Sequence, residues 1–179
     1  FSSDSGFYIP VEFPEKSKDI DMSLDDILDC LKPVFEDSEI SFCGQNIKYD
    51  ALVLSRYGIA LKNINFDTMV AEYLLHPEKN SYKLDYLSLD YLNYRMQPIE
   101  ELIGTGLHQI SMSEVPLQDI SFYAVEDSDV AFQLSSVLMN KLKEESLSVP
   151  YEEIELPLIS VLIEIEKNGV FLDMEYLST

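Results

Sequence analysis

The sequence predicts an α/β fold, in which helices cover a β-sheet, and two observations carry this prediction. Short apolar runs alternate along the chain with longer segments whose apolar residues recur at helical spacing. Of the 179 residues, 46% are hydrophobic and 11% aromatic, which suits a packed core and excludes a disordered chain. No apolar run approaches the roughly 20 residues that cross a bilayer, so we expect no membrane partner.

The first predicted elements are a strand and a helix. Residues 7–13 (FYIPVEF) alternate and are rich in aromatic side chains, which is typical of a strand, and Pro10 favours an edge position or a bulge. Ser23 and Asp26 show the pattern of a capping box at the start of a helix. The apolar side chains of that helix recur at helical spacing and form one stripe: Leu24, Ile27, Leu28, Leu31 and Phe35.

Two further strand–helix pairs are predicted in the first half of the chain. The apolar run at residues 40–43 (ISFC) is followed by a glycine, which indicates a short buried strand. A helix should begin after Asn46 and stop at Gly58. Residues 64–66 favour a second short strand, and residues 69–75 favour the helix that follows it.

The second half of the sequence favours helices. Residues 84–92 keep a helical register, residues 104–113 are polar and loop-like, and residues 116–145 give the longest helical pattern. Pro150 should break the chain, so we place a domain boundary at residues 148–150. The last helix should be amphipathic, with an inward stripe of Ile154, Leu158, Leu162 and Ile165.

The charge of the chain restricts its partners. Only 12 residues are Lys or Arg, against 33 Asp or Glu, which gives a net charge of −21. Surfaces that track phosphates are built from cations, so this composition argues against a domain that binds nucleic acid unaided. Either the partner is not nucleic acid, or another domain holds the nucleic acid and this one receives only an end. Cys30 and Cys43 form no C-x-x-C metal pair and are expected to be reduced thiols.

Three side chains are candidates for chemistry: Asp50, Tyr123 and Asp127. Tyr123 and Asp127 are four residues apart on a predicted helix and therefore share one face. Asn46 and Asp50 follow a predicted buried strand, and ligands gather at the carboxyl ends of strands in open α/β sheets. Several converging carboxylates can hold Mg²⁺ or Mn²⁺ for phosphoryl chemistry. With 33 acidic residues, however, such spacings also arise by chance, and an exposed Asp beside a half-buried Tyr explains them equally.

Four stretches carry a family resemblance. Residues 44–50 (GQNIKYD), 66–69 (FDTM) and 123–130 (YAVEDSDV) resemble, in that order, stretches of the 3′→5′ proofreading exonuclease domains of family A DNA polymerases. Residues 155–173 resemble the opening of the polymerase part that follows in that family. The resemblance implies a ribonuclease H-like (DnaQ-type) mixed sheet flanked by helices, with residues 1–149 as the exonuclease domain and 150–179 as the start of the polymerase domain.

The same resemblance implies an activity, a cofactor and partners. The reaction would be hydrolysis of the 3′-terminal phosphodiester of DNA, releasing nucleoside 5′-monophosphates with the help of two Mg²⁺ or Mn²⁺ ions. The partners would be the single-stranded 3′ end of DNA and the polymerase domain of the same polypeptide. The protein would work in the bacterial cytoplasm, at the nucleoid.

Roles for single residues also follow from the resemblance. Asp127 would ligate the metal that activates the attacking water, Asp50 would help to hold the second metal, and Tyr123 would orient the water. Four side chains would lie beside the terminal nucleotides of the DNA: Gln45, Asn46, Tyr49 and Tyr123.

The sequence departs from the family pattern at its start. The first motif of the family, Asp-x-Glu on the first strand, should precede residue 1, so we expect this chain to be a piece of a longer protein. Asp19-Ile20-Asp21 is the nearest imitation, but it lies in a charged stretch and has Asp in place of Glu. With only Asp50 and Asp127 as ligands, metal should bind weakly or not at all, and this chain alone should be inactive.

Two other functions stay open. A ribonuclease D-like enzyme that trims RNA shares the later motifs, although residues 155–173 favour the polymerase family instead. A non-catalytic module that braces a polymerase is the third reading, and an Asp-x-Glu upstream of residue 1 would decide against it.

Overall fold

The structure is a computed structural model that describes residues 5–11, 22–106 and 109–177. Helices and strands alternate in the first half, as the sequence predicts. The elements there are α1 (Leu24–Phe35), β1 (Phe42–Gly44), α2 (Ile47–Ser55), β2 (Ile64–Asp67) and α3 (Thr68–Leu75).

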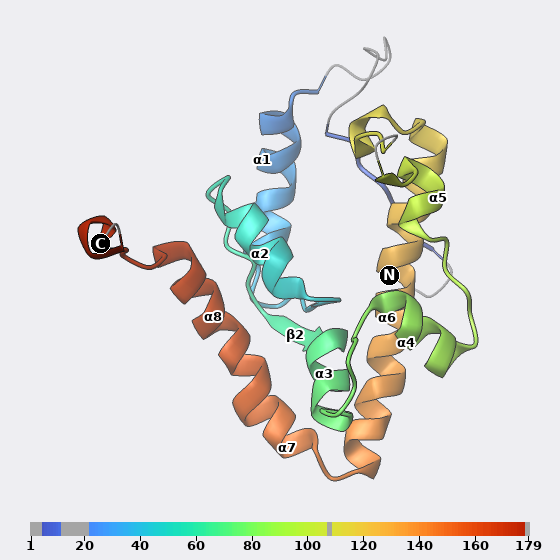
Figure 1. Cartoon of the computed structure of the whole chain (residues 1–179), viewed down its shortest axis with the longest axis vertical. Helices are drawn as coiled ribbons and strands as arrows, with labels where there is room; N and C mark the ends of the chain where they lie inside the picture. The colour runs from blue at the N-terminus through green and yellow to red at the C-terminus, as the bar shows by residue number, and fades with distance from the viewer. Residues whose placement is uncertain (1–4, 12–21, 107–108, 178–179) are drawn as a thin grey trace.

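The second half is helical. Short helical turns connect α3 to one long helix, α6 (Leu117–Glu144), and a second helical arm follows it (Figure 1). The connecting turns are α4 (Leu84–Leu87), the π-helical η1 (Ser88–Leu92), α5 (Ile99–Ile103) and the 3₁₀ turn η3 (Met112–Glu114). The arm consists of α7 (Ser148–Pro150), the π-helical η4 (Tyr151–Glu155), α8 (Leu156–Asn168) and α9 (Met174–Leu177).

The sheet within the described residues consists of β1 and β2. The two strands are parallel, with Phe42 opposite Ile64 and Gly44 opposite Asp67. The predicted α/β class is therefore confirmed, and the two short strands lie where the apolar runs indicated. The mixed sheet that the resemblance implies is larger than this parallel pair.

The first predicted strand is wrong where the structure describes it. Residues 5–11 adopt no strand, and residues 12 and 13 of the predicted run lie outside the described part. A strand needs a neighbour for its backbone hydrogen bonds, and neither β1 nor β2 pairs with this segment. Gly6 lies instead against α6, where a Cβ atom would come within 2.7 Å of Val125 Cγ1.

The predicted helix boundaries are largely confirmed. Ser23 and Asp26 form the capping box of α1, in which the Asp26 N–H donates to Ser23 Oγ and the Ser23 N–H donates to Asp26 Oδ2. The chain leaves α2 through Gly58, whose φ of 70° is the left-handed conformation that favours glycine. The predicted helix at 116–145 is α6, with 28 residues.

The core lies between α6, α3 and the end of β2. Leu134, Leu138 and Leu142 of α6 are fully or almost fully buried against Phe66 of β2 and Tyr151 of η4. Cys30 and Cys43 do not pair with each other, and Cys30 is exposed rather than part of the core, whereas Cys43 is half-buried. No helix in the described ranges is both long and apolar enough to cross a membrane.

The C-terminal arm differs from its prediction in two ways. Pro150 does not break the chain; it lies in the first helical turn of the arm, where proline's missing N–H has no intrahelical partner to lose. The chain reverses earlier, at Ser146, whose φ is 60°. The predicted stripe is also wrong, because the arm buries Ile159 and leaves the predicted side chains of η4 and α8 37–62% exposed: Ile154, Leu158, Leu162 and Ile165.

The reason for the second difference is the direction of the arm. α8 packs along α2 and β2 through the face that carries Ile159 (Figure 1). The predicted stripe therefore lies away from the core, and helical spacing alone does not tell which of two apolar faces of a helix is covered.

Candidate functional site

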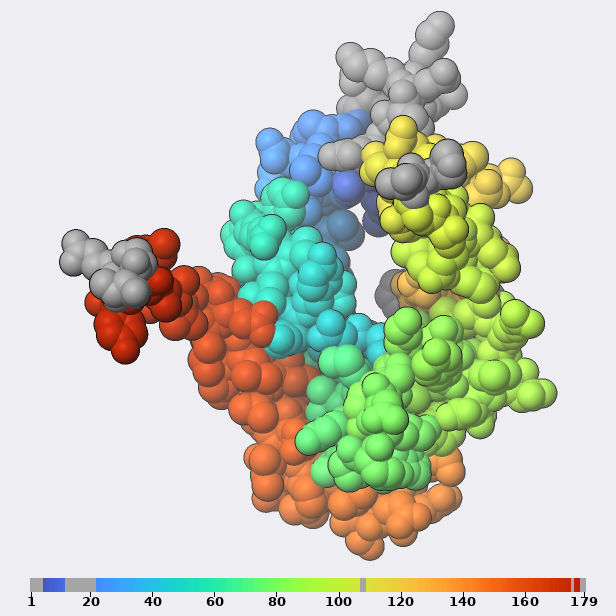
Figure 2. All heavy atoms as spheres, viewed as in Figure 1, coloured from blue at the N-terminus to red at the C-terminus, as the bar shows by residue number. Residues whose placement is uncertain are grey.

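A large cavity lies between the two halves of the molecule. Figure 2 shows it as an opening between α1 and α2 on one side and the segment from α5 to α6 on the other. Its volume is about 1330 Å³. All six residues that the sequence singled out line this cavity: Gln45, Asn46, Tyr49, Asp50, Tyr123 and Asp127.

The turn between β1 and α2 forms one part of the wall. Asn46 sits at the N-cap of α2 in the left-handed conformation, with φ 54° and ψ 45°. Asparagine tolerates this conformation better than most residues, and it lets the chain turn sharply from the strand into the helix. No side-chain hydrogen bond caps the helix at Asn46.

A buried carboxylate, Asp67, holds this turn in place. Its side chain accepts hydrogen bonds from the backbone N–H groups of Asn46 (3.3 Å) and Ile47 (2.8 Å). It also caps α3 by accepting from Met69 (2.9 Å) and Val70 (3.1 Å). Burial raises the pKa of Asp67, and the hydrogen bonds from these backbone N–H groups oppose that shift. One carboxylate therefore fixes the starts of two helices.

Gln45 is engaged by protein on both sides of its amide. Its Nε2 donates to the carbonyl of Tyr82 at 2.7 Å, and its Oε1 accepts from the Thr68 hydroxyl. These bonds clamp residues 81–83 to the carboxyl end of β1. Gln45 thus shapes the cavity wall, and a contact of its amide with a ligand would have to replace one of these bonds.

Tyr49 and Asp50 project from the first turn of α2. Tyr49 is 64% exposed, which leaves its ring free for stacking. Asp50 is exposed and is one of the residues that line the cavity. Desolvation by the surrounding protein raises the pKa of Asp50, its own backbone N–H lowers it, and the charge of Asp67 adds to the increase.

Tyr123 and Asp127 lie one turn apart on α6, as their spacing predicts. Burial raises the pKa of Asp127 to about 6, the charge of Glu126 adds to this, and hydrogen bonding with Tyr123 opposes it. Burial, followed by the charge of Asp127, also raises the pKa of Tyr123, so its phenol stays neutral. The neighbouring Glu126 anchors this part of α6, because it accepts from the Tyr94 hydroxyl at 2.6 Å and the Gln97 N–H at 2.9 Å.

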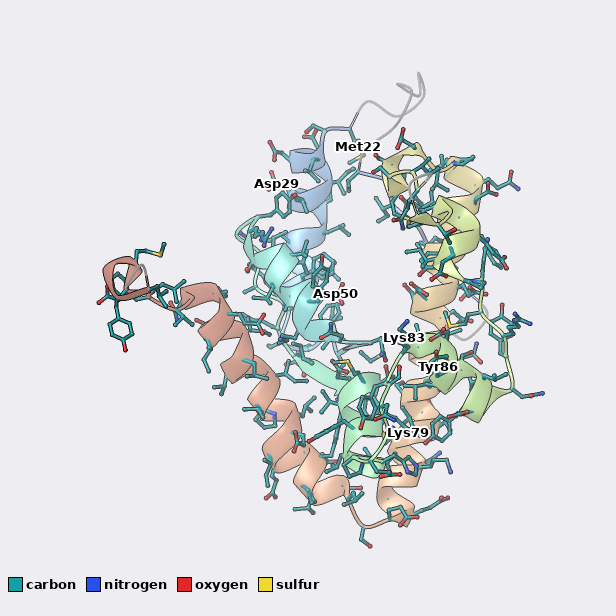
Figure 3. All side chains as sticks on the ribbon, viewed as in Figure 1. Met22, Asp29, Asp50, Lys79, Lys83 and Tyr86 are labelled. Atoms are coloured by element: carbon teal, nitrogen blue, oxygen red, sulfur yellow. The ribbon has the colours of Figure 1, made fainter. Side chains whose placement is uncertain are left out.

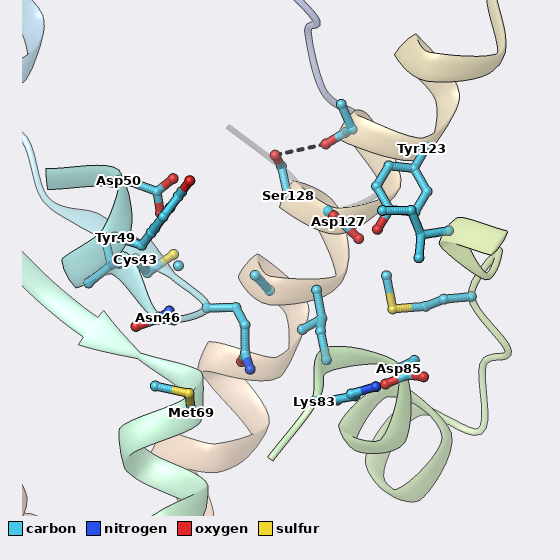
Figure 4. Close-up of a pocket in the computed structure, with 18 of the residues that line it drawn as sticks. Cys43, Asn46, Tyr49, Asp50, Met69, Lys83, Asp85, Tyr123, Asp127 and Ser128 are labelled. Carbon is cyan, nitrogen blue, oxygen red and sulfur yellow. Dashed lines mark hydrogen bonds between the residues drawn. The ribbon is translucent and has the colours of Figure 1, made fainter. Parts of the chain in front are cut away.

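The two carboxylates face each other across the cavity. In Figure 4, Asp50 and Tyr49 belong to the α2 wall, and Asp127 and Tyr123 belong to the α6 wall. Lys83 and Asp85 lie at the α4 side of the same cavity, and Figure 3 shows Lys83 across from Asp50. Two motifs that are far apart in sequence are therefore brought to one cavity.

The cavity is negatively charged. Four carboxylate residues line it: Asp50, Asp85, Glu100 and Asp127. Lys83 is the one Lys or Arg among the lining residues that the structure describes. A phosphodiester entering this cavity would be repelled unless cations neutralised part of the charge.

The donor set fits divalent metal in kind but not in number. Carboxylate oxygens are the ligands that Mg²⁺ and Mn²⁺ prefer. Within the described residues, no group of three or more His, Cys, Asp or Glu side chains lies close enough together to hold an ion. Asp19 and Asp21 lie outside the described residues. Asp50 and Asp127 can contribute to a metal site, and they do not complete one.

Sequence patterns do not reveal the roles of two residues, Asp67 and Tyr151. Asp67 lies in the quoted stretch 66–69, but its place before Thr68 signals only an N-cap. Its bonds to Asn46 and Ile47 depend on strand pairing that a sequence does not display. The Tyr151 hydroxyl, which comes from a helix distant in sequence, accepts from the Asp67 backbone N–H and donates to the Asp67 carbonyl. No local sequence pattern predicts that contact.

Comparison with known proteins adds an independent line of evidence. A family model described as 3′-5′ exonuclease matches residues 5–143. DNA polymerase I of Pseudomonas aeruginosa is 33% identical over 173 residues, which cover 95% of this chain and 19% of that protein. DNA polymerase I of Borreliella burgdorferi is 34% identical over 177 residues, which cover 99% of this chain and 19% of that protein. The chain thus spans about a fifth of the length of these relatives.

Solved structures share the fold. The POL domain of Pol1 from M. smegmatis, in complex with DNA primer-template and dNTP, aligns with a TM-score of 0.65 at 22% identity, covering 88% of this chain and 24% of that one. Brucella melitensis NrnC aligns with a TM-score of 0.65 at 18% identity, covering 78% of this chain and 64% of its own, and its pGG-bound form aligns equally well. Such identities speak for the fold alone, and they agree with the α/β arrangement of strands and helices described above.

Proposed function

We propose, because this chain belongs to the 3′-5′ exonuclease family, that its cavity hydrolyses the 3′-terminal phosphodiester of DNA. The observation that carries the proposal is the meeting of Asp50 and Asp127 at one cavity beside the carboxyl end of β1. The products would be a nucleoside 5′-monophosphate and a DNA strand shortened by one nucleotide. In the parent protein this would serve proofreading.

Asp127 and Tyr123 would handle the attacking water. A carboxylate whose pKa is raised to about 6 is largely ionised at neutral pH, so it can hold a cation or accept a hydrogen bond from water. The neutral Tyr123 phenol can donate to or accept from the same water without changing charge. The water oxygen would bond to phosphorus as the bond to the 3′ oxygen breaks.

Divalent ions are part of the proposal, and this chain would hold them through Asp127 and Asp50. When bound, such ions supply Lewis-acid stabilisation of the phosphate and lower the pKa of a ligated water. Further carboxylates would have to complete the site, because the described residues form no group of three metal-binding side chains. We therefore expect this chain alone to bind Mg²⁺ weakly and to show no nuclease activity.

The substrate would be a frayed single-stranded end rather than a duplex. The exposed ring of Tyr49 offers a base a stacking surface, which contributes roughly 1–3 kcal/mol in other single-strand binders. The acidic lining gives no track for many phosphates, so only a terminus could enter. A polymerase domain of the same polypeptide would hold the duplex, and a mismatched end would reach the cavity because it melts more easily.

An RNA substrate is the second candidate. The observation that favours it is the likeness in fold to NrnC, which has been solved bound to pGG. The residues of the cavity wall do not distinguish ribose from deoxyribose, so an experiment must decide between RNA and DNA as the substrate.

The test uses the intact parent polypeptide with matched DNA and RNA oligonucleotides labelled at the 5′ end. We expect Mg²⁺-dependent shortening of DNA from the 3′ end, at least a hundredfold slower in Asp127→Asn and Asp50→Asn, as removal of a catalytic group commonly causes. Asp29→Asn removes an equal charge from the exposed face of α1 and should leave the rate unchanged. Preferential digestion of RNA would support the second candidate, and no digestion of either would support a non-catalytic brace.

A further inference from the structure

A tyrosine of the C-terminal arm reaches the framework of the cavity. Tyr151 begins η4 and is only 3% exposed, with its ring 5.0 Å from that of Phe66. The Asp67 backbone N–H donates to the Tyr151 hydroxyl oxygen at 2.8 Å. The same hydroxyl donates to the Asp67 carbonyl at 3.3 Å. A phenol suits this position because one oxygen both accepts and donates.

These bonds continue to the cavity wall through the side chain of Asp67. That carboxylate, which is fully buried, holds the backbone N–H groups of Asn46 and Ile47. Asp50 follows in the first turn of the same helix. A chain of hydrogen bonds therefore runs from the C-terminal arm to the turn that presents Asn46 and Asp50.

The arm also supports α2 from the side. α8 packs along α2, and Lys48 forms an ion pair with Glu166 of α8. Lys48 lies two residues before Asp50. The helix that carries one of the two proposed metal ligands is therefore held at its start through Asp67 and along its length by α8.

We propose that Tyr151 is a positioning residue for the cavity, and that residues 148–168 belong to the functional unit rather than only to the part that follows it. A displacement of this arm would loosen the Asn46 turn and shift Asp50. The activity test of this proposal rests on the proposed exonuclease function, whereas the structural test by hydrogen exchange does not.

The structural test measures amide hydrogen exchange in this chain by NMR. Tyr151→Phe keeps the ring and removes the hydroxyl, which leaves the buried Asp67 N–H without its partner. We expect the amides of Asn46, Ile47 and Asp67 to exchange roughly fivefold faster, the size expected for the loss of one hydrogen bond. The amides of Leu134 and Leu138 in the α6 core should keep their protection.

Tyr91→Phe is the matched control. Tyr91 packs against the same core, and its hydroxyl donates to the buried Glu72 at 2.7 Å, away from the Asn46 turn. Its loss should lower stability without a selective effect on Asn46 and Ile47. Unchanged exchange at these two amides in Tyr151→Phe, or an equal increase in Tyr91→Phe, would overturn the proposal.

The activity test uses the parent polypeptide. Tyr151→Phe should lower kcat for removal of the 3′ nucleotide severalfold with a smaller change in KM, because the shift displaces Asp50 while the polymerase domain would hold most of the DNA. An unchanged kcat would refute the positioning role. A parent that lacks nuclease activity would refute the proposed function, while the exchange experiment would still decide the role of Tyr151.

Discussion

Asp67 is fully buried and Asp127 is half-buried, and the protein compensates the two carboxylates differently. Asp67 accepts from the backbone N–H groups of four residues, so dipoles that folding itself supplies partly compensate its burial, which still raises its pKa. Asp127 lacks such a set, and burial leaves its pKa at about 6. An underpaired acid at a cavity is typical of functional sites, where stability is given up for chemistry.

This difference predicts a pH-dependent effect of Asp127→Asn on stability. The pKa of Asp127 is about 6 in the folded chain against 3.8 ordinarily. The stabilisation from its bound proton is complete below the lower value and is lost as the pH rises through the higher one. At about pH 7.5 the variant should melt roughly 2–4 °C higher than the unmutated chain. About 1 kcal/mol causes a shift of this size in a chain of this length.

The gap should close as the pH falls towards about 4, since both chains are then uncharged at this position when folded. Thermal unfolding followed by circular dichroism at several pH values measures it. Asp29→Asn serves as the exposed control of equal charge. A variant that is less stable at every pH would contradict the assigned pKa.

Asp67→Ala should be severely destabilising. The change leaves buried N–H groups at the starts of α2 and α3 without acceptors, and we expect a loss of about 3 kcal/mol or more in the free energy of unfolding. Ser23→Ala, which removes the exposed cap of α1, should cost only about 1 kcal/mol. Urea unfolding of both variants compares them, and equal losses would refute the special role of Asp67.

At the scale of elements, the sequence predicts helices that local interactions determine, but it does not predict contacts between distant segments. Helices are predicted where the signal depends on neighbours within one or two turns. Examples are the capping box at Ser23, the helical spacing along α6 and the glycine after α2. Residues 7–11 have strand composition without a neighbouring strand, and α8 has two apolar faces. In both cases tertiary contacts decide the outcome, and these contacts join residues far apart in the chain.

The candidate site shows the same division. Tyr123 and Asp127 share a face because of helical geometry, and Asn46 and Asp50 follow a strand, so their approximate places could be predicted. The cavity that joins them requires the packing of α6 beside the parallel strands. Spacing alone does not predict that residues 44–50 and 123–130 meet at one cavity. The resemblance of both stretches to one family does.

The turn between β1 and α2 gives a prediction at this scale. Asn46 has a φ of 54°, where a Cβ-bearing residue other than Asn or Asp is strained. Asn46→Ala should lower the free energy of unfolding by about 1 kcal/mol, whereas Asn46→Gly should cost less because glycine adopts this conformation freely. Chemical denaturation of the pair measures the difference, and an alanine variant as stable as the glycine variant would contradict the strained turn.

At the scale of the whole molecule, charge and shape belong together. A net charge of −21 and a cavity lined by four carboxylate residues fit the proposed role, in which another domain would hold the DNA and only its end would reach this cavity. Lys83, the one described cation at the cavity, should help to admit that end. In the parent polypeptide, Lys83→Gln should raise KM for an oligonucleotide severalfold, and Lys143→Gln at the far end of α6 should not. Equal KM values for the two variants would rule out a contact at Lys83.

The central claim is that Asp50 and Asp127 together hold a pair of divalent ions from opposite walls of one cavity. Substoichiometric Mn²⁺ added to this chain tests it most directly, because the ion broadens NMR signals near even a weak site. We expect that amide signals next to Asp50 and next to Asp127 broaden together at the lowest Mn²⁺ concentration, and that Asp127→Asn reduces both effects. Broadening at one wall without the other, or first at acidic residues elsewhere on the surface, would contradict it.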